Sequence, residues 1–444
     1  MKKVLILGAG LVARPLVRYL LDQPGFQVTV AEQTVSKAEA LVAGHPDGTT
    51  EALLVDQTAK LDRLIGEHDL VSSMLPAPLH PAVAKTCIKR RRHLVTPSYA
   101  SPEMNALDGA ARQAGVMILN EIGVDPGIDH MSAMRVIHDV QKRGGQVVSF
   151  RSYCGGLPAP EANDNPWGYK LSWSPRAVCA ACKSSAHFRE NGKQVDIPEP
   201  ELFTCSHPVQ VDGVGELEAY PNRDSLGYLD RYGLQGIETM FRGTFRYAGW
   251  CACLKKVVDL GLLDETPVTY RAGTTFAQFT AKLINASSTD RLRQQVAKHI
   301  GLDESSDVLH RLEWLGLFSD DELPITGRET TRLDVLAARM DEKMAYKKGE
   351  RDMIVLLHQF VARFPDGQEE RISSTLIDFG QPDGDSSMAR TVSLPAAVSA
   401  RLILAGAITD TGVHIPVEPT VYNPVLDELE TLDIRCEEKT LPGA

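Results

Sequence analysis

The sequence predicts an α/β protein in which a doubly wound parallel sheet is joined to a second, mixed α/β part. Three observations lead to this fold class. A short apolar run near the N-terminus ends in a glycine turn, and apolar runs then alternate with helical patterns as far as Asn120. After that residue the pattern changes to longer alternating strands. The 444 residues suffice for two or three domains of ordinary size.

The composition excludes several classes of protein. Apolar residues make up 43% and charged residues 24%, which rules out a fibrous or disordered chain. The 47 Lys and Arg residues against 58 Asp and Glu residues give a net charge of −11, which disfavours nucleic-acid and anionic-membrane partners. No apolar run approaches the ~20 residues that span a bilayer. The first run, 4–11, is too short for a signal peptide, so we expect a cytoplasmic protein.

The eight cysteines are expected to be reduced thiols without a metal. Cys179 and Cys182 form a CxxC, and Cys251 and Cys253 lie two residues apart. Zinc would need a second matched pair or histidines at ligand spacing, and neither is visible. The CxxC lies in a segment with a helical pattern, which favours two small core residues on one face of a helix.

The first 32 residues carry the pattern of a dinucleotide-binding βαβ unit. The unit consists of a buried strand at 4–7, a GAGLVA turn at 8–13, a helix at 14–21 and a strand at 27–31. Further strands are expected at 50–55, 70–75, 93–96 and 116–120, with helices at 81–91 and 102–114 between them. This alternation predicts the doubly wound parallel sheet.

Each small residue of the turn has a distinct expected role. Gly8 permits the tight turn, Gly10 lets backbone amides approach a pyrophosphate at a helix N-terminus, and Ala13 allows close packing of helix and strand. Glu32 is placed to accept hydrogen bonds from ribose hydroxyls, and its alternative is a solvated charge at a strand end. The residues expected to bind the dinucleotide are Gly8, Gly10, Leu11, Val12, Ala13, Glu32, Gln33, Asp56, Leu75 and Pro76.

The chain after Asn120 follows a different pattern. A Gly/Pro-punctuated loop at 121–130 leads into a helix that ends near Lys142. The other expected elements are a strand at 147–153, a helix starting near 175, helical patterns without a convincing strand at 265–340, a hairpin of 351–364 with 368–379, and helices at 387–406 and 423–432. The C-terminal helices are candidates to return to the first domain.

Six sequence blocks resemble saccharopine dehydrogenase of the glutamate-forming type, also called saccharopine reductase. They are NEIGVDPGIDH (120–130), CGGLPAPEANDNPWGYKLSWSPRAV (154–178), FRGTFRYAGW (241–250), GERDMIVLLHQF (349–360), SSMAR (386–390) and TDTGVHIP (409–416). The resemblance implies a Rossmann domain, a mixed α/β substrate and dimerisation domain, a small all-α domain and a homodimer. We place them at 1–122 with about 387–444, at 123–264 with 341–386, and at 265–340.

The resemblance also implies the reaction, which joins 2-aminoadipate 6-semialdehyde with L-glutamate and reduces the imine with a nicotinamide cofactor, reversibly. Saccharopine is a small-molecule amino acid with three carboxylates, and guanidinium groups bind carboxylates in a bidentate manner. Arg223, Arg242 and Arg246 lie in aromatic, Gly-containing segments that suit this task, although each could instead form a surface ion pair. Similarity to the family marks Arg223, Thr244, Phe245 and Arg246 as substrate contacts, and Arg242 is the least certain arginine.

Oxidation of saccharopine requires a neutral secondary amine, because an ammonium has no lone pair with which to expel hydride. The candidates that handle its proton are Asp125, Tyr99 and Cys154, with Asp125 ranked first. Asp125 could instead cap the helix that begins near Gly127, and Cys154 could be only a polarisable wall. The resemblance marks Ser98, Tyr99 and Asp125 as substrate-contacting.

The expected cofactor is NAD in preference to NADP. Fungal members of the family use NADPH and resemble this chain over the second strand, but they place an arginine about where Gln33 stands. A Glu32 carboxylate ~5 Å from a 2′-phosphate would cost about 3 kcal/mol at an effective dielectric constant near 20. Lys37, the nearest lysine, could offset this cost by reaching in.

Two other functions remain open from the sequence. A related imine reductase, such as carboxynorspermidine dehydrogenase, would need fewer arginines because its product lacks a glutamate moiety. A nicotinamide-binding regulator without turnover would not need Arg223, Arg246 and Asp125 together. The sequence does not indicate whether the reaction runs toward lysine or away from it.

Overall fold

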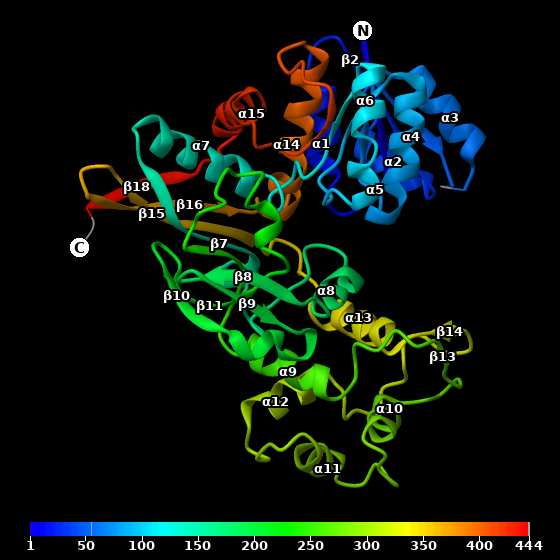
Figure 1. Ribbon diagram of the computed structural model, residues 1–444. Helices are drawn as coiled ribbons and strands as arrows, with labels where there is room; N and C mark the ends of the chain where they lie inside the picture. The colour runs from blue at the N-terminus through cyan, green and yellow to red at the C-terminus, as the bar shows by residue number, and fades with distance from the viewer. Residues whose placement is uncertain (55, 443–444) are drawn as a thin grey trace. The chain divides into compact units, whose positions relative to one another are not determined.

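The computed structural model describes residues 1–54 and 56–442 and divides into two compact units (Figure 1). Unit 1 comprises Met1–Val147 and His358–Ala444, and unit 2 comprises Val148–Leu357. Val55, at the end of the expected 50–55 strand, and residues 443–444, at the end of the segment expected to complete the first domain, lie outside the described residues. The three-domain division expected from the sequence stays a prediction.

Unit 1 contains a seven-stranded parallel sheet in the order β17-β6-β5-β4-β1-β2-β3. This confirms the predicted doubly wound sheet, whose switch in strand order falls between β1 and β4. Strand β17 was not predicted. It comes from the C-terminal part of the chain, far in sequence from the other strands of this sheet. The strands are β1 (Lys2–Leu7), β2 (Phe26–Glu32), β3 (Gly48–Ala52), β4 (Leu70–Ser73), β5 (His93–Val95), β6 (Met117–Leu119) and β17 (Gly412–His414).

The helices of unit 1 that the sequence predicted begin and end within a few residues of the expected positions, with one exception, whereas α2 and α3 were not predicted. The helix expected at 102–114 is two helices, because α5, which Ser101 caps at its N-terminus, ends at its C-cap Ala106 and the next helix starts after Leu107. The helices are α1 (Arg14–Leu21), α2 (Val35–Val42), α3 (Thr58–Glu67), α4 (His80–Arg90), α5 (Pro102–Asn105), α6 (Asp108–Ala114), α7 (Ile128–Lys142), α14 (Ser387–Leu404), α15 (Pro419–Thr431) and a 3₁₀ turn at Ala77–Leu79.

Helix α14 from the C-terminal part packs on α1 within unit 1 (Figure 1). It carries an almost continuous set of small buried residues, which lets it approach closely. The hydroxyl of Ser393 in α14 donates to the carbonyl oxygen of Val12, the residue before Ala13 in the glycine turn. Helix α14 therefore holds the glycine turn in place through its contacts with α1 and Val12.

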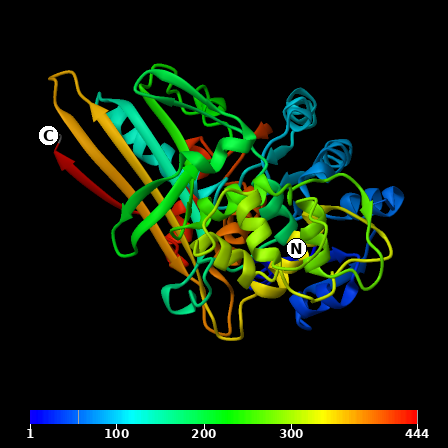
Figure 2. The same cartoon turned by 90° about the horizontal axis from the view of Figure 1, so that it is seen from below.

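The remaining strands of unit 1 form an antiparallel arrangement. They are β16 (Glu369–Phe379), β18 (Glu437–Pro442) and the second half of β15 (Asp352–Arg363), which both units share. Figure 2 shows β16 and β18 as neighbouring arrows, and their register pairs Ile372 with Thr440. The predicted hairpin is confirmed, because β15 and β16 are neighbours in the sheet and the Phe364 N–H donates to the Gln368 carbonyl across the turn between them.

Unit 2 contains a mixed sheet in the order β10-β11-β12-β7-β15, with β8 and β9 as a hairpin beside β12. Strand β7 is longer than predicted, since it continues through the two glycines after Cys154. The strands are β7 (Gln146–Pro158), β8 (Ala186–Glu190), β9 (Lys193–Ile197), β10 (His207–Val211), β11 (Gly215–Pro221), β12 (Thr239–Arg246), β13 (Val268–Thr269) and β14 (Glu329–Thr330).

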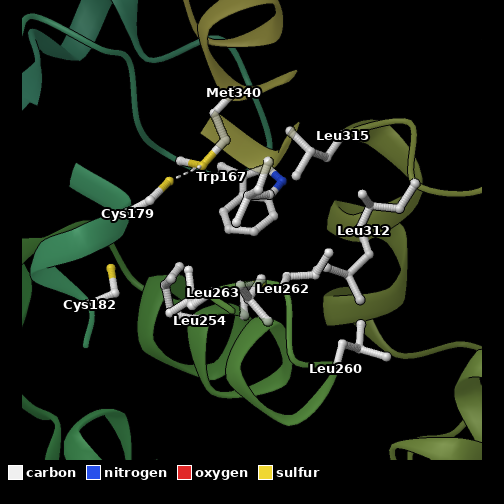
Figure 3. Close-up of a cluster of buried hydrophobic side chains, with 14 of the residues drawn as sticks. Trp167, Cys179, Cys182, Leu254, Leu260, Leu262, Leu263, Leu312, Leu315 and Met340 are labelled. Atoms are coloured by element: carbon white, nitrogen blue, oxygen red, sulfur yellow. Dashed lines mark hydrogen bonds between the residues drawn. The ribbon is translucent and has the colours of Figure 1, made fainter. Parts of the chain in front are cut away.

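The helical part of unit 2 surrounds a large apolar cluster (Figure 3). Two short paired strands, β13 and β14, occur where the sequence showed no convincing strand, so the expectation of an all-α segment at 265–340 is wrong in this detail. Two residues per strand are too few for an alternating pattern to be visible. The helices are α8 (Pro175–Ala181), α9 (Trp250–Asp259), α10 (Phe276–Leu283), α11 (Leu292–His299), α12 (Asp307–Trp314) and α13 (Arg332–Lys343), with 3₁₀ segments at Pro160–Ala162, Glu199–Cys205 and Leu226–Tyr228.

The CxxC cysteines are part of this core. Cys179 and Cys182 are buried, and the thiol of Cys179 contacts the sulfur of Met340 at 3.6 Å (Figure 3). Burial raises the pKa of both thiols. The prediction that these residues are core residues is confirmed, and all eight cysteines are free thiols. In the part of the chain that the structure describes, no group of three or more His, Cys, Asp or Glu side chains is arranged to hold a metal ion.

Candidate active site

The glycine turn between β1 and α1 has the geometry of a phosphate cradle. Gly8 has φ +98°, and a Cβ there would lie 3.3 Å from the carbonyl oxygen of Met74. A Cβ on Gly10 would meet no atom within 4 Å, so the turn leaves open space at this residue. The turn lines a cavity of about 370 Å³ together with Glu32, Gln33, Leu75 and Pro76. These features fit a dinucleotide whose pyrophosphate lies against the start of α1.

Glu32 is tied to the turn by backbone hydrogen bonds. Its Oε2 accepts from the Ala9 N–H at 2.8 Å, and its Oε1 accepts from the Thr34 N–H at 3.3 Å. The neighbouring Gln33 is exposed and lines both this cavity and a second one of about 760 Å³, to which Asp56 and Lys60 contribute. Lys60 is paired with Glu51 at 2.9 Å.

Ser98, Tyr99 and Asp125 come together beyond the carboxyl ends of β5 and β6. All three side chains are half-buried, and the Tyr99 hydroxyl donates to Asp125 Oδ1 at 3.2 Å. The N-cap residue of α7 is Gly127, which has no side chain that could form a capping hydrogen bond. Asp125 therefore lies two residues before the N-cap position, and its role in proton transfer stays a prediction.

Gly127 explains the compact shape of the loop before α7. It has φ +148°, and a Cβ there would lie 2.0 Å from the carbonyl oxygen of Gly123. No residue other than glycine fits this close approach of two backbone segments. The loop therefore holds Asp125 beside Tyr99.

Glu121 holds the Ser98–Tyr99 segment in place, a role that the sequence argument missed. It has φ +57°, which is uncommon for a residue other than glycine. Its N–H donates to the Ser98 carbonyl, its Oε1 accepts from the Ala100 N–H at 3.0 Å, and its Oε2 lies 2.8 Å from His130 Nε2. The only signal in the sequence was an acidic residue next to a buried strand, which is common.

Arg246 ends β12 in unit 2 and is buried. Its guanidinium lies 4.8 Å from the ring of Tyr169 and 5.3 Å from that of Trp250. Nη1 donates to the Phe245 carbonyl at 2.7 Å, whereas Nε has no acceptor. The buried Nε1 of Trp250 also lacks one. Among the described residues no Asp or Glu pairs with Arg246, although an isolated buried charge is costly.

The other predicted residues of unit 2 lie on β12 and its neighbours. Arg242 is buried with its guanidinium 4.7 Å from the Tyr228 ring, and its carbonyl accepts from the Asn222 N–H. Arg223 follows in an exposed loop with φ +51°. Cys154 is buried on β7. It pairs in register with Thr244, so the two side chains point to the same face of the sheet.

Comparison with known proteins gives two family matches. The saccharopine dehydrogenase NADP binding domain matches residues 4–119, and the saccharopine dehydrogenase C-terminal domain matches residues 123–434. None of the helices in the described residues combines the length and the apolar character that a bilayer crossing requires.

Relatives align with almost the whole chain. Saccharopine dehydrogenase [NADP(+), L-glutamate-forming] of Schizosaccharomyces pombe is 41% identical, and that of Saccharomyces cerevisiae is 38% identical, each over 99% of both chains. The bovine mitochondrial alpha-aminoadipic semialdehyde synthase is 36% identical over 97% of this chain and 47% of its own length. The solved structure of apo saccharopine dehydrogenase (L-Glu forming) from S. cerevisiae superposes with a TM-score of 0.89 at 37% identity, over 99% of this chain and 100% of that one.

These findings overturn the preference for NAD. The fungal relatives are named for NADP(+), and the matching N-terminal family is an NADP binding domain, so the expectation that NAD is favoured is wrong. The expected repulsion assumed that Glu32 is a free carboxylate facing the ribose. In the structure both of its oxygens accept backbone N–H groups, which offset part of its charge, so the estimated repulsion was too large.

The family resemblance noted from the six sequence blocks is confirmed. It now rests on matches to both halves of the chain, on relatives of the same length and on one superposable structure. The chain belongs to the saccharopine dehydrogenase family.

Proposed function

We propose that this protein interconverts saccharopine with L-glutamate and 2-aminoadipate 6-semialdehyde, with NADP as the hydride carrier. The names of the full-length relatives support this activity and this cofactor. The open space at Gly10 and the cavity beside it support a bound dinucleotide.

The observation that carries the proposal is the buried, acid-free guanidinium of Arg246. A protein stabilises a buried charge with an opposite charge, and here the described residues supply none. A substrate carboxylate would provide the missing charge and would accept from the free Nε–H. The Trp250 Nε1–H, which also lacks an acceptor, is a second donor of the same cluster. A ligand with several carboxylates, such as saccharopine, matches this need.

NADP, when bound, supplies the acceptor for the hydride that leaves the carbon next to the amine. Before that, Asp125 takes the proton of the secondary ammonium, and the Tyr99 hydroxyl holds the carboxylate in place by its hydrogen bond. Cys154 forms a polarisable wall beside Thr244. Water then adds to the imine carbon and releases glutamate and the semialdehyde.

The remaining residue roles follow the same proposal. The cofactor is held by Gly8, Gly10, Leu11, Val12, Ala13, Glu32, Gln33, Asp56, Leu75 and Pro76, of which Leu11 is exposed and free to contact a ligand. The substrate is held by Ser98, Tyr99, Asp125, Arg223, Thr244, Phe245 and Arg246, with Arg242 as a further cation.

The test is a turnover assay with purified protein. Saccharopine and NADP are mixed with the enzyme, the absorbance of reduced cofactor is followed, and L-glutamate is quantified. We expect both products in equal amounts. Carboxynorspermidine is the control substrate, and turnover of it alone would replace the proposed substrate. Binding of NADP without turnover of either compound would indicate a nicotinamide-binding regulator.

We also propose a homodimer, as the family resemblance implies. Light scattering coupled to size-exclusion chromatography should give twice the mass of one chain. A mass equal to one chain across the concentration range of the assay would contradict the dimer.

A further inference from the structure

His80, at the start of α4, has both ring nitrogens bonded to hydroxyl groups from two neighbouring strands. Its Nδ1 lies 3.1 Å from Ser73 Oγ at the end of β4. Its Nε2 lies 2.9 Å from Ser98 Oγ and 3.1 Å from Thr96 Oγ1, both just beyond β5. The ring thus connects the carboxyl ends of two parallel strands, the edge at which ligands bind in this fold.

Only one of these hydroxyl groups is open to a ligand. His80 is 2% exposed, and Ser73 and Thr96 are fully buried, whereas Ser98 is half-buried. Any effect of the ring on a bound molecule therefore passes through Ser98.

The backbone of Ser98 is already fixed on both sides. Its N–H donates to Thr96 Oγ1 at 3.3 Å, and its carbonyl accepts from the Glu121 N–H at 3.0 Å. The direction of the Ser98 O–H bond is then the remaining freedom of this residue.

The imidazole controls that direction because it is neutral. Burial lowers the pKa of His80 to about 4, so near neutral pH the ring carries one N–H donor and one acceptor nitrogen. If Nε2 accepts, Ser98 donates to the ring and turns its lone pairs outward. If Nε2 carries the proton, Ser98 accepts and its own O–H is available to a ligand.

We propose that His80 is a positioning residue that fixes the Ser98 hydroxyl for contact with the substrate. The proposal rests on the proposed function, in which Ser98 is a substrate contact. It assigns to His80 no contact with substrate or cofactor, and it predicts that the effect of His80 disappears when Ser98 has no hydroxyl.

Two substitutions separate the two ring nitrogens. An asparagine places a polar atom where Nδ1 lies and none at Nε2, whereas a glutamine reaches the Nε2 position. We expect His80→Asn to lower kcat/KM for saccharopine about tenfold, the effect of one lost hydrogen bond. The loss should be divided between a lower kcat and a higher KM in the same proportion as in the Ser98→Ala variant. His80→Gln should stay within about threefold of the wild type.

The matched control is His68, a second buried histidine of unit 1. Its Nδ1 lies 2.6 Å from the Leu64 carbonyl and its Nε2 2.8 Å from Thr29 Oγ1, so both of its ring nitrogens are also bonded, but to no candidate site residue. His68→Asn should lower the melting temperature while kcat/KM stays within about twofold.

The deciding measurement is a double-mutant cycle. If His80 acts through Ser98, the double variant His80→Asn with Ser98→Ala should be no slower than Ser98→Ala alone. If the two losses multiplied, so that kcat/KM of the double variant fell about a hundredfold, the proposal would be overturned. His80 would then have a purely structural role.

A second measurement needs no turnover and so separates this proposal from the proposed function. In ¹⁵N-histidine-labelled protein without substrate, Ser98→Ala should shift the Nε2 resonance of His80 and leave the Nδ1 resonance in place. If neither resonance moves, the link between the residues is refuted whatever the substrate is. If the wild type fails to oxidise saccharopine but the Nε2 resonance shifts, the proposed function fails and the His80–Ser98 link stands.

Discussion

The end of β12 and the helix α13 each bury one arginine in unit 2, and the two differ in how the charge is balanced. Arg339 in α13 is 2% exposed, and Arg246 in β12 is 7% exposed. Each guanidinium lies over an aromatic ring, at 4.6 Å from Phe276 for Arg339 and at 4.8 Å from Tyr169 for Arg246. By burial and by aromatic contact the two sites are alike.

Their polar partners are not alike. Arg339 pairs with Asp321 and with Glu342 at 2.8 Å, and it donates to the Leu315 carbonyl. Within the described part of the chain, Arg246 donates only to the carbonyl of the residue before it. The comparison teaches that burial alone does not mark a functional charge. A buried charge that has oppositely charged partners within the protein serves the fold. A buried charge without such partners indicates a place where a ligand binds.

The first prediction separates chemistry from binding with Asp125. Asp125→Asn keeps the shape of the side chain but cannot take a proton, so kcat for saccharopine oxidation should fall about 10²- to 10³-fold. KM should change little, and the loss of activity on the acidic side of the pH profile should disappear. Steady-state rates from pH 5 to 9 measure both. An unchanged rate with a lower melting temperature would give Asp125 a structural role.

The second prediction concerns Arg246 itself. Arg246→Met should raise KM for saccharopine by a factor that corresponds to about 2–3 kcal/mol, because a hydrogen-bonded ion pair to a carboxylate is lost. The free energy of unfolding should stay the same or rise, since the variant removes an uncompensated buried charge. If the binding of NADP and of saccharopine weakened equally and the variant unfolded at lower urea concentration, the variant would be misfolded. Arg246 would then lose its assignment as a substrate contact.

The third prediction is the counterpart at Arg339. Arg339→Met should lower the free energy of unfolding by about 2 kcal/mol, through lost hydrogen bonds and lost packing on Phe276. KM for saccharopine should remain within about twofold. A large rise of KM in a folded Arg339→Met protein would break the distinction drawn between the two arginines.

The fourth prediction extends the comparison to Glu32 in unit 1, whose carboxylate accepts hydrogen bonds from backbone N–H groups. Glu32→Gln should weaken the binding of NAD and of NADP by the same factor, about fivefold. The reason is that the turn loses a charged hydrogen-bond acceptor, which contributes about 1 kcal/mol. The kcat/KM ratio of the two cofactors should stay constant. A changed ratio would show that Glu32 contacts the ribose region directly.

Local patterns predicted the βαβ unit well. The run at β1, the spacing of Gly8 and Gly10 and the helix that follows all depend on neighbours in sequence, and α1 begins and ends where the sequence indicated. The error at 102–114 lies at Ala106 and Leu107, where the helix is interrupted although both residues keep backbone angles close to helical, so the sequence pattern continues through the break.

The candidate site was predicted less completely, because its supports come from distant parts of the chain. Glu32 was misjudged since its partners are backbone N–H groups, one of them 23 residues away, and backbone donors leave no mark in a side-chain pattern. His80 was missed because its partners Ser73, Thr96 and Ser98 meet it only after the parallel strands have formed. Arg246 could be named from its aromatic, Gly-containing segment, but its lack of an acid is a fact of the fold alone.

The neutral imidazole of His80 also makes unit 1 sensitive to acid. An unfolded histidine takes up a proton near pH 6.5, whereas the folded His80 does so only near pH 4. Unfolding therefore consumes a proton in this interval, and stability that is fully present above pH 6.5 is lost as the pH falls toward 4, by about 3 kcal/mol for this residue. Burial lowers the pKa of His68 and His93 in the same direction, and both belong to unit 1. Mild acid should thus destabilise the dinucleotide-binding unit by proton uptake at buried imidazoles, in addition to the proton uptake at Asp62 and Asp108, whose pKa values hydrogen bonds lower.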